Sequence, residues 1–246
     1  MSLSQARAAS GDPASGPEDH RVRVARQKRE KMRRRLLAAT LQACAEKDTL
    51  APVVVDEIMR VANVSRGTFY NYFTSVEEAV GAVGRQQADE FSASVIQLRG
   101  GIASPVRHVA VANHLFLVRA ALDPVWGSYF LRWNYLLIPS KGGDIMVSAL
   151  SLGREAGDFR FEHLSNAVDF VMGAVLGATR RIVRGEHVSL ANICEAQRMI
   201  LQGLGVSARR ADETLRYTVA YVREHGPQLG WWRDLDSDGR DAARAD

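Results

Sequence analysis

The run from Val64 to Phe73, with the sequence VSRGTFYNYF, constrains the fold more than any other part of the chain. Residues 55–62 place apolar side chains at helical spacing just before it. Asn63 then interrupts this short helix, and Asn adopts a left-handed turn conformation more readily than other non-glycine residues. Ser65 can cap the helix that follows by accepting from its free backbone N–H groups. Helix, tight turn and helix within about 18 residues predict a helix-turn-helix.

The second of these helices carries an unusual mixture of side chains. Phe69 and Phe73 are spaced to anchor it in a core. The hydroxyl and amide groups of Thr68, Tyr70, Asn71 and Tyr72 crowd onto the same two turns. Such a pattern is typical of a recognition helix that faces a nucleic-acid duplex. The alternative for the tyrosines is core packing, but burial would require partners for their hydroxyl groups.

Charge is concentrated near the N-terminus. The 246-residue chain has a net charge of +4, whereas residues 21–35 contain nine Arg or Lys residues and one acidic residue, Glu30. The rest of the chain is therefore slightly acidic, and the imbalance indicates that one end meets a polyanion. We expect Arg33 and Arg34 to contact DNA, with a solvated basic tail as the alternative.

The rest of the chain predicts an all-α protein. No segment alternates with the period of two that is typical of strands. No apolar run is long enough to span a membrane, and the N-terminus lacks the apolar core of a signal peptide, so a cytoplasmic, nucleoid-associated protein is expected. Helices are expected at about 26–47, 55–62, 65–72, 75–98, 105–121, 124–138, 143–156, 160–185, 189–204 and 207–225. The domains expected are a disordered basic arm (1–24), a helix-turn-helix domain (25–73), a helical regulatory and dimerisation domain (74–225) and a polar tail (226–246).

The stretch from Leu36 to Val80 resembles the DNA-binding domain of the tetracycline-repressor (TetR) family of bacterial transcription regulators. The motif that carries the resemblance is Val-Ser-x-Gly-Thr-Phe-Tyr-x-Tyr-Phe at residues 64–73, followed by a helix led by Ser and Glu. It covers about a fifth of the chain. Val54 departs from the family pattern, which places a phosphate-binding Thr or Ser there, and Met59 and Asn63 replace a common Ala and Gly. Loss of one phosphate contact lowers affinity for all sequences without removing recognition.

The resemblance implies how DNA is bound. The capped helix would enter the major groove, the only groove that distinguishes all four base pairs. Gly67 would allow close backbone approach, and Thr68 would contact base edges or a thymine methyl. Tyr70 and Tyr72 would donate to phosphates, which sets the register without reading sequence. The DNA-contacting residues implied by the resemblance are Ser65, Arg66, Gly67, Thr68, Tyr70, Asn71 and Tyr72, with Arg33 and Arg34 from the basic segment.

A homodimer is expected, because one short helix reads too few base pairs for useful specificity. An apolar heptad pattern in residues 164–182 and a second stripe in 193–204 would form a four-helix interface, as in the resembled family. The alternative is that these stripes belong to the core of one chain. The interface residues expected are Leu164, Val168, Val171, Gly173, Val175, Gly177, Ala178, Ile182, Ile193, Ile200 and Leu204.

A small apolar or aromatic effector is the other expected partner, besides double-stranded operator DNA. Large aromatic side chains recur on one face of residues 126–133, and large aromatics with a few polar groups are what a small-molecule pocket needs. Simple core packing is the alternative for such a stripe. The residues expected to line the pocket are Asn113, Phe116, Trp126, Tyr129, Phe130, Trp133 and Met172.

The resemblance implies a ligand-responsive regulator, by the family default a repressor of a near-palindromic operator. Three other classes of protein are the alternatives. An enzyme is not indicated, since the sequence shows no nucleophile with a positioned base and no phosphate-binding glycine loop. No metal or cofactor is expected either, and the two cysteines, Cys44 and Cys194, lack metal-ligand spacing. A non-specific architectural DNA-binding protein and a TetR-fold interaction protein without a ligand both remain open.

Overall fold

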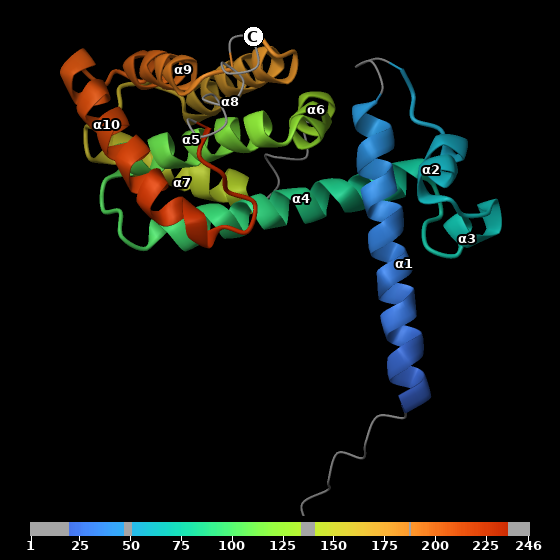
Figure 1. The fold of residues 1–246 in the computed structure, drawn as a ribbon. Helices are drawn as coiled ribbons and strands as arrows, with labels where there is room; N and C mark the ends of the chain where they lie inside the picture. The colour runs from blue at the N-terminus through green and yellow to red at the C-terminus, as the bar shows by residue number, and fades with distance from the viewer. Residues whose placement is uncertain (1–19, 47–50, 134–140, 187, 236–246) are drawn as a thin grey trace, which may run out of the picture.

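The computed structural model describes residues 20–46, 51–133, 141–186 and 188–235. Within these ranges the chain is helical and contains no strand, as the sequence predicts. Three N-terminal helices form one unit at the end of the long helix α4, which leads from them into a body built from the remaining helices (Figure 1). The helices are α1 (His20–Ala45), α2 (Val55–Ala62), α3 (Arg66–Tyr70), α4 (Val76–Arg99), α5 (Pro105–Leu122), α6 (Pro124–Arg132), α7 (Lys141–Glu155), α8 (Leu164–Val183), α9 (Leu190–Gly203) and α10 (Ala208–His225).

Side-chain caps explain why so many of these boundaries could be predicted. Ser75, Ser189 and Ser207 each accept a hydrogen bond from a backbone N–H in the first turn of the helix that follows. Asp123 caps α6 in the same way by accepting from the N–H of Trp126. Each cap satisfies one of the backbone donors that have no partner within the helix.

Helix α5 lies at the centre of the body and contacts α4, α6, α7, α8, α9 and α10. Its residues 113–118 are all buried, so no face of this stretch is free for solvent. A helix that is buried on all sides must be surrounded by other elements of the chain. The cavity described below lies along this central helix.

Helix α6 fastens the body to the N-terminal unit. The Tyr129 hydroxyl donates a hydrogen bond to the carbonyl of Val80 in α4, over 2.8 Å. Arg132 donates to the carbonyl of Ala51, just before α2. Helix α6 also packs against α1. The position of the three N-terminal helices is therefore tied to the body through α4 and α6 together.

The expected N-terminal arm needs correction at its end. Helix α1 begins at His20, so residues 20–24 are helical and continuous with the first helix. The reason is composition: residues 20–45 contain no Gly or Pro and are rich in Arg, Lys, Gln and Ala, which favour helix. Residues 1–19 lie outside the described part of the chain.

The C-terminal segment also differs from the expected polar tail. Residues 226–235 begin with a short 3-10 helix, η2 (Gly226–Gln228), and pack on the body. Leu229 is buried, and the indole N–H of Trp231 donates to the hydroxyl of Ser94 over 3.0 Å. Trp231 and Trp232 could have indicated this packing from the sequence, because large aromatic side chains bury much apolar area. Residues 236–246 are outside the described range.

Candidate DNA-binding surface and effector pocket

The turn between α2 and α3 is set by Asn63, which has a φ of 48°. The N–H of Asn63 donates to the carbonyl of Arg60 over 3.2 Å, and the N–H of Val64 donates to that of Met59 over 3.1 Å. These two bonds close the last turn of α2 in the pattern that left-handed C-caps produce. The expectation of a left-handed conformation at Asn63 is confirmed.

Helix α3 begins as the sequence predicts. The Ser65 hydroxyl accepts from the N–H of Thr68 over 3.2 Å and lies 2.9 Å from the Thr68 hydroxyl. The helix ends at Tyr70, earlier than expected, so Asn71 is its C-cap and Tyr72 follows it in a turn. The Thr68 hydroxyl and N–H are therefore both part of the cap of α3.

Two phenylalanines hold α3 in place. Phe69 and Phe73 are both buried, with ring centroids 5.8 Å apart. Their burial fixes which side of α3 faces outward, since residues one or two positions away point elsewhere. The anchoring role expected for them is confirmed.

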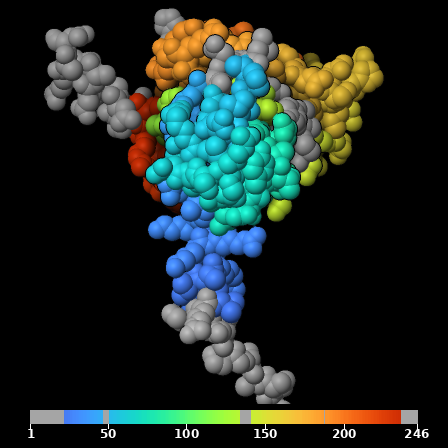
Figure 2. All heavy atoms as spheres, turned by 90° about the vertical axis from the view of Figure 1, so that its right-hand side faces the viewer, coloured from blue at the N-terminus to red at the C-terminus, as the bar shows by residue number. Residues whose placement is uncertain are grey.

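The outward side of α3 presents the remaining motif residues to solvent. Ser65, Arg66, Gly67, Tyr70 and Asn71 are exposed, whereas Thr68 and Tyr72 are half-buried. A Cβ atom added at Gly67 would meet no other atom within 4 Å, so the fold itself does not require glycine there. The missing side chain instead leaves space for another molecule to approach the backbone. The helices α2 and α3 together form the face turned toward the viewer in Figure 2.

Basic side chains of α1 adjoin this face. The Arg33 guanidinium lies 5.8 Å from the ring centroid of Phe73, and that of Arg29 lies 5.9 Å from the ring centroid of Tyr72. Arg34 is exposed and pairs with Glu30 over 3.7 Å. The N-terminal half of α1 extends well beyond α2 and α3 (Figures 1 and 2). Arg29 was not among the residues predicted to contact DNA, although it belongs to the basic run from which DNA contacts were predicted.

The start of α2 lacks a side-chain cap, as expected from Val54. Valine offers no acceptor, and the Glu57 carboxylate instead accepts from the backbone N–H of Val54 over 3.2 Å. Helix α2 is therefore closed at this end by its own third residue rather than by a hydroxyl free to touch phosphate.

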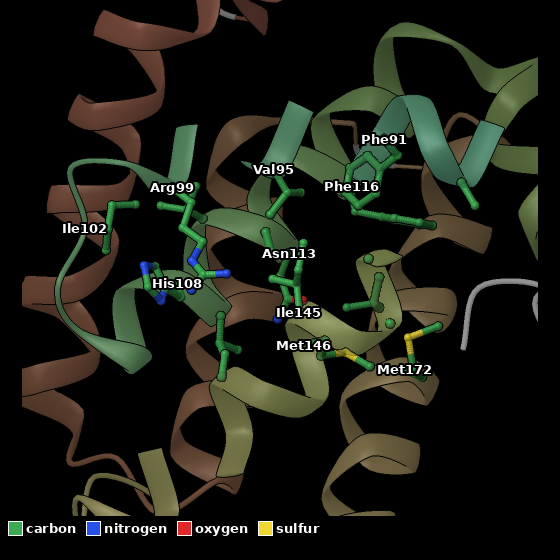
Figure 3. Close-up of a pocket in the computed structure, with 18 residues that line it drawn as sticks. Phe91, Val95, Arg99, Ile102, His108, Asn113, Phe116, Ile145, Met146 and Met172 are labelled. Carbon is green, nitrogen blue, oxygen red and sulfur yellow. The ribbon is translucent and has the colours of Figure 1, made fainter. Parts of the chain in front are cut away.

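A partly open apolar cavity lies between α4, α5 and α7, with α8 at its base (Figure 3). Its volume is about 70 Å³. Three of the residues predicted to line a pocket do so, namely Asn113, Phe116 and Met172. The other lining residues are Ala88, Phe91, Val95, Arg99, Ile102, His108, Val109, Val111, Ala112, Gly142, Gly143, Ile145, Met146, Ala149 and Val175.

The aromatic stripe of α6 does not line this cavity, which corrects the prediction for four residues. Trp126, Tyr129 and Phe130 are fully buried in the core, and Trp133 is half-buried near Cys44. The rings of Trp126 and Phe130 pack with centroids 4.6 Å apart, and that of Phe116 lies 4.8 Å from Trp126. The stripe faces α1, α5 and α8, so core packing, the alternative, describes it.

One end of the cavity is polar. Arg99 and His108 lie there, Asn113 lies in the middle, and Phe91 and Phe116 lie toward the other end (Figure 3). Burial lowers the pKa of His108, so its ring is neutral near pH 7. Of these three polar residues, only Asn113 was predicted from the sequence to line a pocket. Arg99 and His108 were missed because single polar residues carry no periodic signal.

The apolar stripe of α8 proves to be core. Val168, Val171, Val175, Ala178 and Ile182 are buried within one chain, and Leu164 is half-buried. The predicted α9 residues Ile193, Ile200 and Leu204 are likewise buried. The interface prediction is therefore corrected to core for this stripe, because it packs α8 against α5 and α6 and packs α9 against α5.

A different face of α8 and α9 is open to solvent. Among the predicted interface residues, Gly173 is exposed and Gly177 half-buried, and a Cβ atom at either would meet no other atom within 4 Å. Phe170 is 45% exposed and Met199 is 66% exposed, which is high for large apolar side chains. We call this surface, formed by Phe170, Gly173, Gly177, Met199 and Gly203, the α8–α9 face.

Solved structures place this architecture among known proteins. RolR in complex with resorcinol is 26% identical, with a TM-score of 0.59, and the match covers 77% of this chain and 95% of RolR. A TetR family transcription regulator from Marinobacter aquaeolei VT8 is 18% identical, with a TM-score of 0.60 over 72% of this chain and 97% of that one. FadR from Bacillus subtilis in complex with stearoyl-CoA is 17% identical, with a TM-score of 0.57 over 71% of this chain and 98% of FadR. No protein-family model and no curated protein matches the chain.

The fold and the capped helix define a helix-turn-helix protein with a separate, all-helical C-terminal body. The chain has the fold of the TetR family of transcription regulators, and the resemblance seen in residues 36–80 is thereby confirmed. No helix in the described ranges has the length and apolar character needed to cross a membrane.

Proposed function

We propose that the chain is a TetR-type transcriptional regulator, by default a repressor, that binds a near-palindromic operator as a homodimer and is released by a small molecule. The observation that carries this proposal is α3 itself, capped by Ser65, anchored by Phe69 and exposed at Arg66, Gly67 and Tyr70. A short rigid helix with this outward side fits the major groove. Basic side chains of α1 beside it would neutralise phosphates.

The exposed α8–α9 face supports the homodimer in this proposal. Two exposed apolar side chains flank glycines that leave open space above the helix surface. A second copy packing there would bury Phe170 and Met199 and would form a four-helix interface. Two copies of α3 would then read half-sites about 34–36 Å apart.

A route from ligand to DNA runs along α4. Its first turns touch the N-terminal unit and α6, where Val80 accepts from Tyr129, while its last turns supply Phe91, Val95 and Arg99 to the cavity. A ligand that moves the C-terminal end of α4 would tilt its other end together with α3. The two half-sites would then no longer be matched by one dimer.

A selection of bound duplexes from random sequence tests the proposal, followed by titration of the selected site at a fixed salt concentration. We expect a near-palindromic site to be preferred over random DNA by at least about 10³-fold. Equal affinity for all duplexes would contradict it and would favour a non-specific architectural role.

That second role is favoured by one observation, the solvent-exposed basic half of α1. It predicts that substitutions at Ser65 and Thr68 leave DNA affinity unchanged, while removal of charge at Arg26 and Arg29 lowers affinity equally for every duplex. The regulator proposal predicts instead that Thr68 substitutions change the order of preference among sites.

A further inference from the structure

The cavity brings three nitrogen-bearing side chains to an otherwise apolar wall. Arg99 ends α4, and His108 and Asn113 come from α5. The Arg99 guanidinium points into the space between the other two (Figure 3). Among the 18 residues that line the cavity there is no Asp or Glu.

Arg99 has no acidic partner in the described part of the chain. Several other arginines of this protein do pair, for example Arg210 with Asp158 over 2.7 Å and Arg198 with Asp212 over 2.7 Å. The Arg99 side chain is exposed, so water solvates its charge, and no carboxylate of the described residues occupies the guanidinium. A negatively charged group entering there would find it available.

Asn113 supplies an independent indication. The residue is 7% exposed, and its side chain has no hydrogen-bond partner among the described residues. An amide that lines a cavity and has no protein partner keeps its hydrogen-bonding capacity for water or a ligand. The Nε2 atom of His108 is fully buried without a partner among the described residues. Both residues can donate or accept hydrogen bonds, while Arg99 can only donate.

The size and lining of the cavity limit the rest of the ligand. Phe91, Phe116, Met146 and Met172 form the apolar part of the wall. An apolar cavity of about 150 Å³ holds one benzene ring, and the volume here is about 70 Å³. One ring or a short chain therefore already needs movement of the walls, which the two flexible methionines allow.

We propose that this pocket binds a small apolar carboxylate, with its acid group held by Arg99 and Asn113 beside His108 and its apolar part against Phe91 and Phe116. The proposal rests on the proposed function, since the same pocket is the effector site there. It names the class of effector: an organic anion with one ring or a short chain. The charge of Arg99 and the lack of an acid among the described lining residues disfavour a cationic effector.

Matched pairs of acid and amide test this on the full chain at pH 7.5. Benzoate, phenylacetate and hexanoate are compared with benzamide, phenylacetamide and hexanamide by isothermal titration. We expect at least one acid to bind about tenfold or more tightly than its amide, because hydrogen bonds to charged groups exceed neutral ones in strength. Acids that bind no better than their amides, or no binding by any of the six, would overturn the proposal.

Variants of Arg99 and Asn113 test whether these two residues cause the preference for the acid over the amide. R99Q is expected to abolish the preference for the acid while the amide binds as before, and N113L is expected to weaken binding of the acid. R216Q, which removes an exposed charge on α10 away from the cavity, is the matched control and should keep the preference. A preference that survives in R99Q overturns the proposal, and thermal melting identifies a variant that fails to fold, in which case N113L decides.

DNA binding separates this inference from the function on which it rests. If the protein selects a specific site from random DNA but shows no preference for acids, only the ligand class is wrong. If it shows no selectivity among duplexes, the proposed function is wrong regardless of what the cavity binds.

Discussion

The Tyr129 hydroxyl donates a hydrogen bond to the Val80 carbonyl across 49 positions of sequence. Both side chains are buried, so water does not compete for this bond. It fixes α6 against the part of α4 that adjoins the DNA-binding unit. The residue that seemed suited to hold a ligand thus holds two helices together.

Replacing Tyr129 with Phe removes this bond and leaves the ring in place. We expect the free energy of unfolding to fall by about 1 kcal/mol, the typical net contribution of one hydrogen bond. Urea denaturation measures it. Tyr217→Phe is a suitable control because Tyr217 is half-buried and stacks on Tyr221 through its ring. An equal loss in both variants would contradict the importance of the Tyr129 bond.

Removing the cap of α3 should weaken DNA binding. Ser65→Ala deletes the acceptor for the Thr68 N–H and should destabilise the short helix by about 1 kcal/mol. All duplexes should be bound several-fold more weakly, as measured by mobility shift at fixed salt. Ser189→Ala deletes the corresponding cap of α9, far from α3, and is expected to leave DNA affinity unchanged.

The basic residues beside α3 should determine the salt dependence. Arg33→Gln is expected to reduce the slope of log affinity against log salt by about 1, because one phosphate contact is lost. The preference among sites should not change, since a phosphate contact carries no sequence information. Arg216→Gln serves as the control, and an unchanged slope for Arg33→Gln would exclude Arg33 from the phosphate contacts.

An acidic side chain on the α8–α9 face should dissociate the dimer. Met199→Glu places a charge at a position that is 66% exposed in one chain, so the monomer should keep its fold while association is lost. Light scattering during size-exclusion chromatography reports the mass. Leu152→Glu introduces the same charge at a residue on α7 that is 49% exposed, and it should leave the dimer intact. A monomeric wild type would contradict the proposed assembly.

His114 should make stability depend on pH. Burial lowers the pKa of this residue to about 4, and its Nδ1 lies 2.9 Å from the Gln197 amide nitrogen. The folded state therefore keeps the ring neutral, whereas the unfolded chain takes up a proton below about pH 6.5. Stability should be full above that pH and fall as the pH drops toward 4, by about 2 kcal/mol between pH 7.5 and pH 5.

Urea denaturation at these two pH values measures the effect. His114→Gln should remove this part of the pH dependence, although the variant should be less stable at both values. An unchanged dependence in His114→Gln would assign it to other groups.

The helix order and the DNA-binding motif could be predicted because their signals are local. Ser65 and Ser75 begin helices by bonding to backbone groups three positions away, and Asn63 ends one by its own conformation. Such interactions depend only on residues that are close together in the sequence. The alternation of apolar and polar residues then gives the length of each helix.

The site in the body could not be predicted in the same way. A stripe such as Trp126, Tyr129 and Phe130 shows that one face of a helix is buried, but not which partner covers it. The same holds for Val171 and Val175 in α8. Arg99 and His108 come together only through the packing of α4 on α5, and nothing in either local sequence marks them.

Helix α1 is one continuous helix with a buried C-terminal half and a solvent-exposed N-terminal half. Its C-terminal half is buried through Leu36 and Leu37, while residues 22–35 are largely surrounded by solvent and carry the basic run. Repulsion among these cations opposes helix formation at low ionic strength, and the run itself contains a single acidic residue, Glu30. A polyanion such as heparin should therefore raise the helical circular dichroism signal of the free protein, with no operator needed.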